Sequence, residues 1–303
     1  MAMPKSLDGE NPPVRVARLA MATRFEVALH GPRPEALRAA AEDALDEVER
    51  VEQWLSPYLH ASFIARIQRE AHLRPVPVAP PVFSFLSLVA DLVHATGGAF
   101  DPTVGPLLRA WGFHGGTPLP PDPSSLPGAL SRVGWHHVRL DPETHSVRLL
   151  VPGVEIHPGA IGKGWALDRA AAVLRDAGVE CGLLHGGGSS IVAIGAPPGL
   201  ASWRVALPSN PAASHPPDAA AGVVVELRDE TLSVSAAWGR SQDGPAHVLD
   251  PRTGQPVPAG TFAAVVLPEA ARSDAWSTAL LVDPVCVPGA LQARHPGARW
   301  WTG

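Results

Sequence analysis

Apolar and polar positions alternate near the start of the chain, between Val14 and Gly31. This alternation predicts two strands, or one bent strand. Pro32 and Pro34 then open a segment with a different spacing, in which apolar residues recur every three or four positions as far as Leu55, with charged residues between them. That pattern predicts an amphipathic helix that buries one face and leaves the other in solvent.

The later patterned segments predict three more helices and a hairpin. The helices are expected at about 81–96, 163–177 and 268–281, and the hairpin strands at 137–140 and 147–151. Two segments, 114–129 and 207–221, are poor in bulky apolar residues and are predicted to be surface loops. Because strands and helices do not alternate strictly, we expect an α+β fold rather than a doubly wound α/β sheet.

Composition narrows the class of protein. The chain has 303 residues, of which 46% are hydrophobic and 17% charged, which is enough apolar material for a large core. No apolar run reaches the roughly 18 residues of a membrane span, so no transmembrane segment is expected. A net charge of −5 without a basic block gives no indication of nucleic-acid binding. The two cysteines, Cys181 and Cys286, cannot form a disulfide framework, and we expect both in the core.

The first residues of the chain carry little information about location. Residues 1–13 have no apolar stretch and no small-residue cleavage site, so no signal peptide is visible. On this basis the expectation is a flexible tail and a cytoplasmic protein, or a periplasmic one if a leader has been removed.

A glycine-rich segment with one lysine comes directly before a predicted helix. The segment Gly159–Gly164 reads GAIGKG, and its Lys163 is one of only two lysines in the chain, the other being Lys5. Glycines allow close approach of a ligand, and amides at a helix start favour anions. The spacing is not that of a Walker P-loop, so an ordinary turn into a helix remains an equal alternative.

Three other segments could take part in binding or catalysis, and each also has a purely structural interpretation. Gly186–Gly188 joins two apolar runs and is either a tight strand connection or a small-residue floor beneath a ligand. His247 comes just before a polar turn at 250–254 and, taken alone, is an ordinary histidine. Asp274 and Thr278 share one face of a predicted helix, where two hard oxygens suit Mg²⁺ or Ca²⁺; the alternative is a carboxylate that complements the helix dipole.

The order of the motifs resembles a known family. In sequence order they are Met21-Ala-Thr23, Leu55-Ser-Pro-Tyr58, Gly98-Ala-Phe-Asp-Pro-Thr103, Gly159–Gly164 with Asp168, Gly187-Gly-Ser-Ser190, His247 with Asp250-Pro-Arg-Thr-Gly254, and Ser273-Asp-Ala-Trp-Ser-Thr278. This series resembles the ApbE-like flavin transferases, the FAD:protein FMN transferase family.

The resemblance implies a fold and a reaction. The fold is α+β, a T-fold-type single catalytic domain of two sub-lobes, with mixed or antiparallel sheets and flanking helices. It would occupy 14–283, with the tail 1–13 before it and a C-terminal extension, 284–303, packed on it. The reaction splits FAD with Mg²⁺ and transfers FMN to a Thr or Ser hydroxyl of a target flavoprotein, releasing AMP.

The resemblance also assigns roles to individual residues. His247 would be the general base for the acceptor hydroxyl. The metal would be held by the carbonyl of Ala160 and the side chains of Asp274 and Thr278. The residues that would contact FAD are Met21, Tyr58, Ala99, Phe100, Asp101, His157, Lys163 and Val248.

Two positions depart from the family pattern and leave alternatives open. Where the family has an aspartate that contacts FAD, this chain has His157, and where it often has asparagine, this chain has Gln68. Exchange of a carboxylate for an imidazole changes both charge and hydrogen-bonding capacity. The alternatives are an FAD pyrophosphatase that yields FMN and AMP, a non-catalytic FAD-binding protein, and a structural protein that uses the fold to bind partners.

Overall fold

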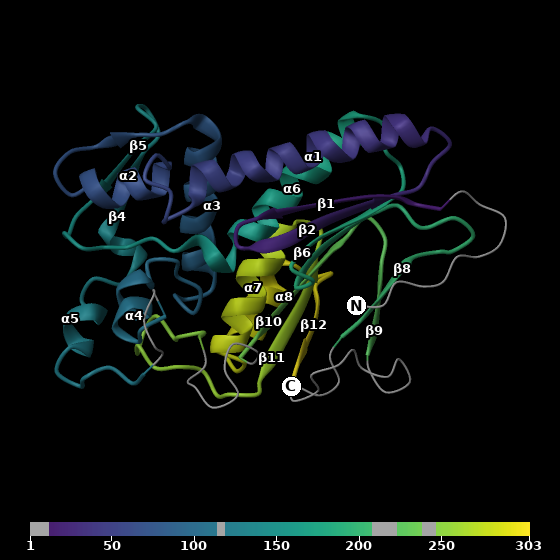
Figure 1. Ribbon diagram of the computed structural model, residues 1–303. Coiled ribbons are helices and arrows are strands. Elements are labelled where there is room, and N and C mark those ends of the chain that lie inside the picture. Colours follow the sequence, from purple (N-terminus) through teal and green to yellow (C-terminus); the bar gives the residue numbers. More distant parts are fainter. Residues whose placement is uncertain (1–11, 114–118, 208–222, 238–246) are drawn as a thin grey trace. The chain divides into compact units, whose positions relative to one another are not determined.

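A computed structural model describes residues 12–113, 119–207, 223–237 and 247–303 (Figure 1). It confirms the predicted α+β class, with antiparallel sheets and flanking helices. Most of the predicted tail 1–13 and of the predicted loop 207–221 lies outside the described residues. None of the helices in the described part is long and apolar enough to cross a membrane.

The chain divides into two compact units, each built from three segments. The first unit comprises Met1–Glu52, Lys163–Val234 and Ala264–Asp274. The second comprises Gln53–Gly162, Ser235–Ala263 and Ala275–Gly303. Each unit therefore depends on sequence segments that lie far apart.

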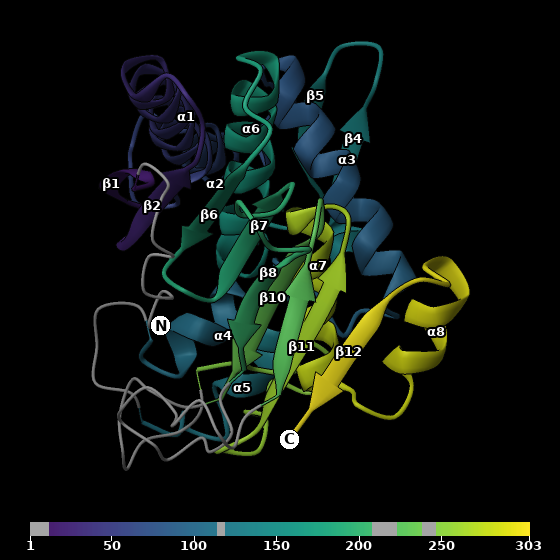
Figure 2. The same ribbon diagram turned by 90° about the vertical axis from the view of Figure 1, so that its right-hand side faces the viewer.

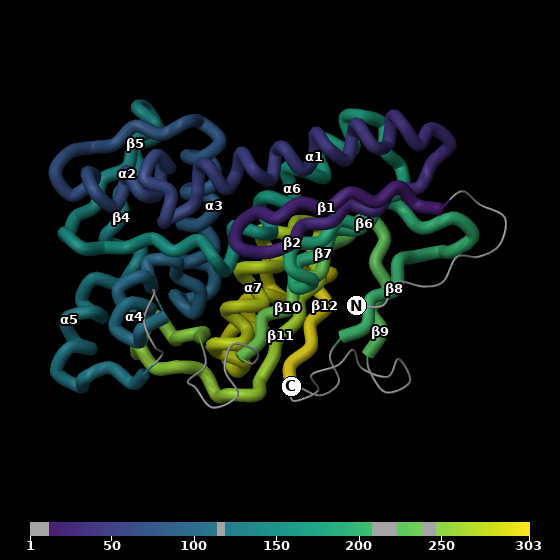
Figure 3. The backbone as a smooth tube through the Cα atoms, viewed as in Figure 1, coloured from purple at the N-terminus to yellow at the C-terminus, as the bar shows by residue number. Residues whose placement is uncertain are grey.

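A twisted antiparallel sheet forms the first unit, with strands in the order β1-β2-β6-β7-β10-β11. The strand bounds are Val14–Ala20, Thr23–Leu29, Gly182–Gly186, Ser190–Ile194, Thr231–Ala236 and Phe262–Leu267. A separate ribbon pairs β8 (Trp203–Ala206) with β9 (Val224–Leu227), as the chain trace in Figure 3 shows. The predicted alternation at Val14–Gly31 is thus confirmed as two strands.

Two helices lie along the β1-β2-β6 part of this sheet in Figures 1 and 2: α1 (Pro34–Leu55) and α6 (Gly162–Asp176). The predicted apolar face of α1 is buried, and its charged face pairs with neighbouring elements. Arg18 on β1 bonds Glu42 at 2.7 Å, and Arg169 on α6 pairs with Glu47. Hydrophobic burial supplies most of the stability here, at about 25 cal/mol per Å² of apolar surface.

The second unit is mainly helical, with a small sheet in the order β3-β5-β4. Its strands are β3 (Val76–Pro77), β4 (Val138–Asp141) and β5 (Ser146–Leu149), so the predicted hairpin is confirmed. Its helices are α2 (Phe63–Glu70), α3 (Pro80–Ala95), α4 (Gly105–Ala110) and α5 (Leu126–Leu130), with 3₁₀ turns at Trp135–His137 and Pro158–Ala160. A cluster of buried apolar residues joins α4 to α5: Leu107, Trp111, Ala129, Val133 and Leu249.

The C-terminal part contains α7 (Ala270–Val282), α8 (Val287–Arg294) and β12 (Arg299–Thr302). In the second unit β12 pairs with the start of β11, because Phe262 and Gly303 exchange two backbone hydrogen bonds of 2.7 and 3.1 Å. The final residues therefore extend the sheet.

Three expectations need correction. The expected loop 114–129 contains the start of α5, whose first turn takes Pro127 because proline fits at a helix N-terminus. Cys181 is only half-buried and Cys286 is exposed, so neither is a core residue. The Cys181 thiol lies 3.0 Å from the carbonyl oxygen of Ala196, which gives this polar atom a partner at the edge of the fold.

Candidate functional site

The last three residues of the Gly159–Gly164 segment begin α6, and Gly164 lies directly against the start of α7. A Cβ atom on Gly164 would lie 2.7 Å from the backbone nitrogen of Ala271 and closer still to the carbonyl of Ala270. Only glycine allows the two backbones to approach so closely. The glycine therefore has a packing reason, which the sequence alone did not reveal.

The N-terminus of α7 is capped by a carboxylate from another helix. Asp168 on α6 accepts hydrogen bonds from the backbone N–H groups of Ala270 and Ala271, at 2.7 and 2.8 Å. Burial raises the pKa of Asp168 to about 6, and these two donors oppose the shift. Along the sequence Asp168 is part of a motif, but its role as a helix cap cannot be seen there.

Asp274 is buried in the first unit and accepts three hydrogen bonds from separate elements. Its Oδ1 accepts from the hydroxyls of Ser190 (2.7 Å) and Ser233 (2.6 Å), and its Oδ2 accepts from the Gly164 N–H (2.7 Å). The carboxylate is therefore held in one orientation by β7, β10 and α6.

This arrangement bears on the helix-dipole interpretation of Asp274. The carboxylate at the N-terminal amides of α7 is that of Asp168, whereas Asp274 lies one turn further along the helix. Complementing the helix dipole is therefore the role of Asp168 rather than of Asp274. Gly164, which donates to Asp274, directly follows Lys163 in the chain.

Met21 lies in the two-residue turn that joins β1 to β2. Both turn residues have positive φ, 51° at Met21 and 57° at Ala22, a region that side-chain-bearing residues rarely adopt. The Met21 N–H donates to Oε1 of Glu52 at 2.8 Å, which holds the turn. Gly187 and Gly188 also have positive φ, in the connection from β6 to β7, so this segment is the tight strand connection that was one of its two interpretations.

The Ala99–Asp101 segment of the second unit is buried and held by its own aspartate. One oxygen of Asp101 accepts from the N–H (2.8 Å) and hydroxyl (2.6 Å) of Thr103, and the other accepts from the Trp135 N–H (2.8 Å). Burial raises the pKa of Asp101, and the same donors oppose that shift. The carboxylate thus holds the loop, and the N–H groups of Ala99 and Phe100 donate to the carbonyl and hydroxyl of Thr96, at 3.2 and 3.3 Å.

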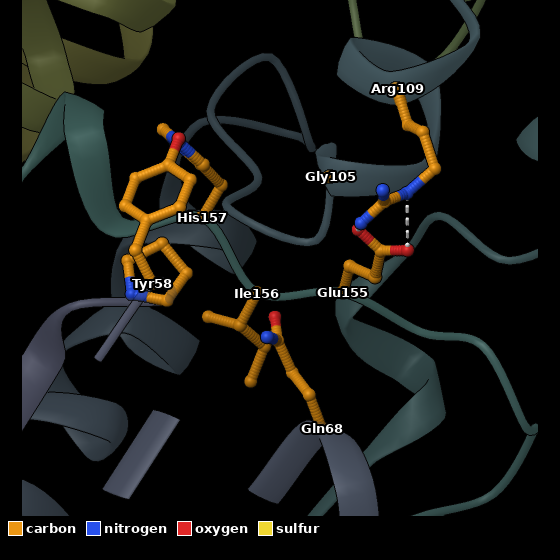
Figure 4. A pocket seen from close by; sticks show the side chains of 8 residues that line it. Tyr58, Gln68, Gly105, Arg109, Glu155, Ile156 and His157 are labelled. Atoms are coloured by element: carbon orange, nitrogen blue, oxygen red, sulfur yellow. Dashed lines mark hydrogen bonds and ion pairs between the residues drawn. The ribbon is translucent and has the colours of Figure 1, made fainter. Parts of the chain in front are cut away.

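A small pocket in the second unit is lined by both residues that depart from the family pattern, Gln68 and His157 (Figure 4). It has a volume of about 70 Å³, and Tyr58, Gln68, Arg109, Glu155 and His157 contribute to its wall. The Tyr58 hydroxyl lies 3.3 Å from Nε2 of His157, and the two rings meet edge to face. Two predicted flavin contacts are therefore neighbours.

The backbone beside His157 joins this pocket to the Ala99–Asp101 segment. The His157 N–H donates to the carbonyl of Pro102 at 2.6 Å, and the Gly105 N–H donates to the carbonyl of Glu155 at 3.2 Å. The Glu155 carboxylate in turn accepts two hydrogen bonds from Arg109, at 3.0 and 2.9 Å. The second unit thus brings Tyr58, His157 and the 99–101 loop into one region.

His247 and Val248 are half-buried and come just before the polar turn. The predicted Asx-type start of this turn is confirmed, because Oδ1 of Asp250 accepts from the Arg252 N–H at 2.9 Å. The turn is fixed to α4 by a hydrogen bond from the Trp111 indole to the carbonyl of Gly254, also 2.9 Å. The segment that carries His247 therefore leads into an ordered turn.

The remaining predicted metal ligands lie in the second unit. Ala160 is the last residue of a 3₁₀ turn, and Thr278 is on α7, where its hydroxyl lies 3.0 Å from that of Ser235. Within the described ranges no group of three or more His, Cys, Asp and Glu residues could hold a metal ion.

The predicted residues divide between the two units. The first unit holds Met21, Lys163 and Asp274, and the second holds Tyr58, Ala99, Phe100, Asp101, His157, Ala160, His247, Val248 and Thr278. Sequence reasoning missed the serines that contact Asp274. The signal was present as hydroxyl residues at every second position of β10, but nothing along the chain shows what they face.

Comparison with known proteins gives a consistent match. The model of the ApbE family matches residues 21–297. A protein named FAD:protein FMN transferase from Klebsiella pneumoniae is 30% identical over 262 residues, which cover 82% of this chain and 72% of the relative. A protein of the same name from Treponema pallidum is 27% identical over 300 residues, 93% of this chain and 82% of the relative.

Solved structures agree with the sequence comparison. The ApbE protein of Thermotoga maritima superposes with a TM-score of 0.83 at 26% identity, covering 95% of this chain and 93% of the other. The flavinyl transferase ApbE of Pseudomonas stutzeri, in its apo form, gives a TM-score of 0.80 at 24% identity, covering 98% and 92%. At that identity the second likeness concerns the fold alone.

Proposed function

The chain belongs to the ApbE family and is an FAD:protein FMN transferase, and we propose that it uses Mg²⁺ to transfer FMN from FAD to a Thr or Ser hydroxyl of a target flavoprotein, releasing AMP. One observation carries the proposal. Gly164 and Asp274, which belong to two separate motifs of the resemblance, are joined by a 2.7 Å hydrogen bond. Motifs that are 110 residues apart thus contribute to one buried arrangement.

The proposed reaction is a phosphoryl-group displacement. The acceptor hydroxyl oxygen forms a bond to the FMN phosphorus, and the pyrophosphate bond from that phosphorus to the AMP oxygen breaks. Catalysis of this kind depends mostly on positioning and on neutralising phosphate charge. We assign the ammonium of Lys163 to the phosphate oxygens, and His247 to the acceptor hydroxyl, whose proton its imidazole accepts.

The donor atoms fit a magnesium ion. Asp274 and Thr278 are four residues apart on α7 and share a helix face, and the family pattern adds the carbonyl of Ala160. All three are hard oxygen donors, and Mg²⁺ is commonly held by one or two carboxylates together with substrate phosphates. When bound, the ion would neutralise charge on the FAD pyrophosphate.

For the flavin itself we propose contacts with residues that the family pattern assigns. Met21 would contribute from the β1–β2 turn, and Val248 from its position next to His247. Ala99, Phe100 and Asp101 would contribute through backbone carbonyl groups, because the Asp101 carboxylate is engaged by Thr103 and Trp135. The N–H groups of Ala99 and Phe100 already donate to Thr96.

His157 is proposed to contact FAD together with Tyr58, its neighbour at 3.3 Å. An imidazole supplies one acceptor at most, where an aspartate supplies a carboxylate pair. Titration of FAD fluorescence with the wild-type protein and with His157→Asp tests this role. We expect at least a threefold change in the dissociation constant for FAD, and equal constants would exclude His157 from the contact.

A single experiment separates transfer from hydrolysis. The protein is incubated with FAD and Mg²⁺, with and without an acceptor flavoprotein, and AMP is measured by chromatography. Transfer predicts AMP release that depends on the acceptor, together with covalent FMN on it. Release at the same rate without acceptor would instead indicate an FAD pyrophosphatase, and recovery of intact FAD would indicate a binding protein without turnover.

A further inference from the structure

The hydroxyl residues of β10 form a ladder against one face of α7. Thr231, Ser233 and Ser235 are at alternate positions, so they lie on the same side of the strand. Their partners on α7 are, in the same order, Ser273 at 2.7 Å, Asp274 at 2.6 Å, and both Ser277 and Thr278 at 2.8 and 3.0 Å. We call these seven residues the hydroxyl ladder.

The ladder is buried where it meets Asp274. Ser233 is 3% exposed and its cross-strand neighbour on β7, Ser190, is 1% exposed. Each serine has a single hydroxyl proton, and each donates it to Oδ1 of Asp274. Buried hydroxyls cost stability unless they are hydrogen-bonded, and Asp274 supplies the acceptor for both of these serines.

The donors restrict how Asp274 can bind a cation. A carboxylate oxygen has two lone pairs, and the two serines take both lone pairs of Oδ1. Chelation through both oxygens would have to displace a serine hydroxyl. A cation bound here would therefore be held by Oδ2, the oxygen that also accepts from Gly164.

A similar restriction applies to Thr278 in the second unit. Its hydroxyl lies 3.0 Å from the Ser235 hydroxyl, which lies 2.8 Å from that of Ser277. If Thr278 donates to Ser235 and Ser235 donates to Ser277, the lone pairs of Thr278 remain oriented away from Ser235. A cation favours this direction of donation, because it binds hydroxyl oxygens through lone pairs.

We propose that Ser190 and Ser233 are positioning residues that make Asp274 a monodentate ligand of the catalytic cation, and that Ser235 does the same for the Thr278 hydroxyl. The inference rests on the proposed magnesium site. Groups that hydrogen-bond a metal ligand commonly change metal affinity by 10- to 100-fold when they are removed. The ladder thus has a role in cation binding beyond joining β10 to α7.

The test compares serines that touch Asp274 with a ladder residue that does not. The variants are Ser233→Ala, Ser190→Ala and Thr231→Val; Thr231 is equally buried but contacts Ser273 and the carbonyl of Leu267. Binding of Mn²⁺ to each protein in the presence of FAD is measured by electron paramagnetic resonance. The Mg²⁺ concentration for half-maximal AMP release and the KM for FAD are measured separately.

We expect Ser233→Ala and Ser190→Ala each to weaken Mn²⁺ binding about tenfold and to raise the half-saturating Mg²⁺ concentration equally, with an unchanged KM for FAD. Thr231→Val should change Mn²⁺ binding less than twofold. If one serine variant does not fold, the other carries the same prediction, because the serines are on different strands. Mn²⁺ affinities equal to wild type, or the same loss in Thr231→Val, would overturn the inference.

Asp274→Ala distinguishes this inference from the proposed function. If that variant binds Mn²⁺ as tightly as the wild type, the proposed metal site is wrong and the ladder inference is wrong with it. If Asp274→Ala loses Mn²⁺ while both serine variants retain it, the metal site stands and only the positioning role fails.

Discussion

Gly164 offers the sharpest test of the contact between α6 and α7. In Gly164→Ala the new methyl group would lie 2.7 Å from the Ala271 nitrogen and closer to the Ala270 carbonyl. These are backbone atoms, which cannot rotate away as a side chain would. Relief therefore requires the two helix starts to separate.

The cost has two components. Forcing a methyl group into a well-packed contact costs about 1–3 kcal/mol. Separation also lengthens the hydrogen bond from the Gly164 N–H to Asp274, now 2.7 Å, and a bond to a charged group contributes about 1.5–3 kcal/mol. Together these terms predict that Gly164→Ala lowers the free energy of unfolding by about 2.5–6 kcal/mol.

Urea denaturation followed by circular dichroism measures this change. The matched control is Gly289→Ala in α8, where a Cβ atom meets nothing within 4 Å. Alanine is preferred over glycine in a helix by up to about 1 kcal/mol, so the control should be neutral or more stable. A Gly164→Ala protein as stable as the wild type would refute the close approach of the two helices.

Three further substitutions test other parts of the structure. Ala22→Gly should raise stability by about 1 kcal/mol in urea denaturation, because alanine is strained at φ 57°; a loss of stability would contradict this. Trp111→Phe should cost about 1–3 kcal/mol, since it leaves the Gly254 carbonyl without its indole donor, and an unchanged thermal midpoint would count against that bond. Asp168, whose pKa is raised to about 6, binds its proton more tightly in the folded state, so its contribution to stability should fall by at most about 3 kcal/mol between pH 4 and 7. Asp168→Asn should show a smaller fall over this range, and equal pH profiles would refute the assignment.

Long, regular elements could be predicted from the sequence, whereas short ones could not. The helix α1 spans 22 residues with one apolar face, and its observed bounds, Pro34–Leu55, agree with the prediction. The eight residues of α2 are too few to establish a periodicity, although Ser62 caps the helix by accepting from the Ala65 N–H at 3.0 Å. A serine before a short segment predicts a helix cap only when the helix itself has already been identified.

The chemistry around Asp274 shows a second limit. The oxygen pair of Asp274 and Thr278 could be found from helix spacing, since both lie on α7. The donors Gly164, Ser190 and Ser233 are separated from Asp274 by 110, 84 and 41 residues. No local pattern encodes contacts at such distances, because they depend on how α6, β7 and β10 pack.

Transfer of FMN to protein is the central claim, and mass spectrometry of an acceptor tests it most directly. The protein is incubated with FAD, Mg²⁺ and an acceptor flavoprotein that the Klebsiella pneumoniae relative flavinylates in a parallel reaction. We predict that the acceptor mass increases by that of FMN less one water, with one AMP released per acceptor, and that Asp274→Ala abolishes both. An unmodified acceptor and intact FAD, in a reaction where the relative succeeds, would contradict the account.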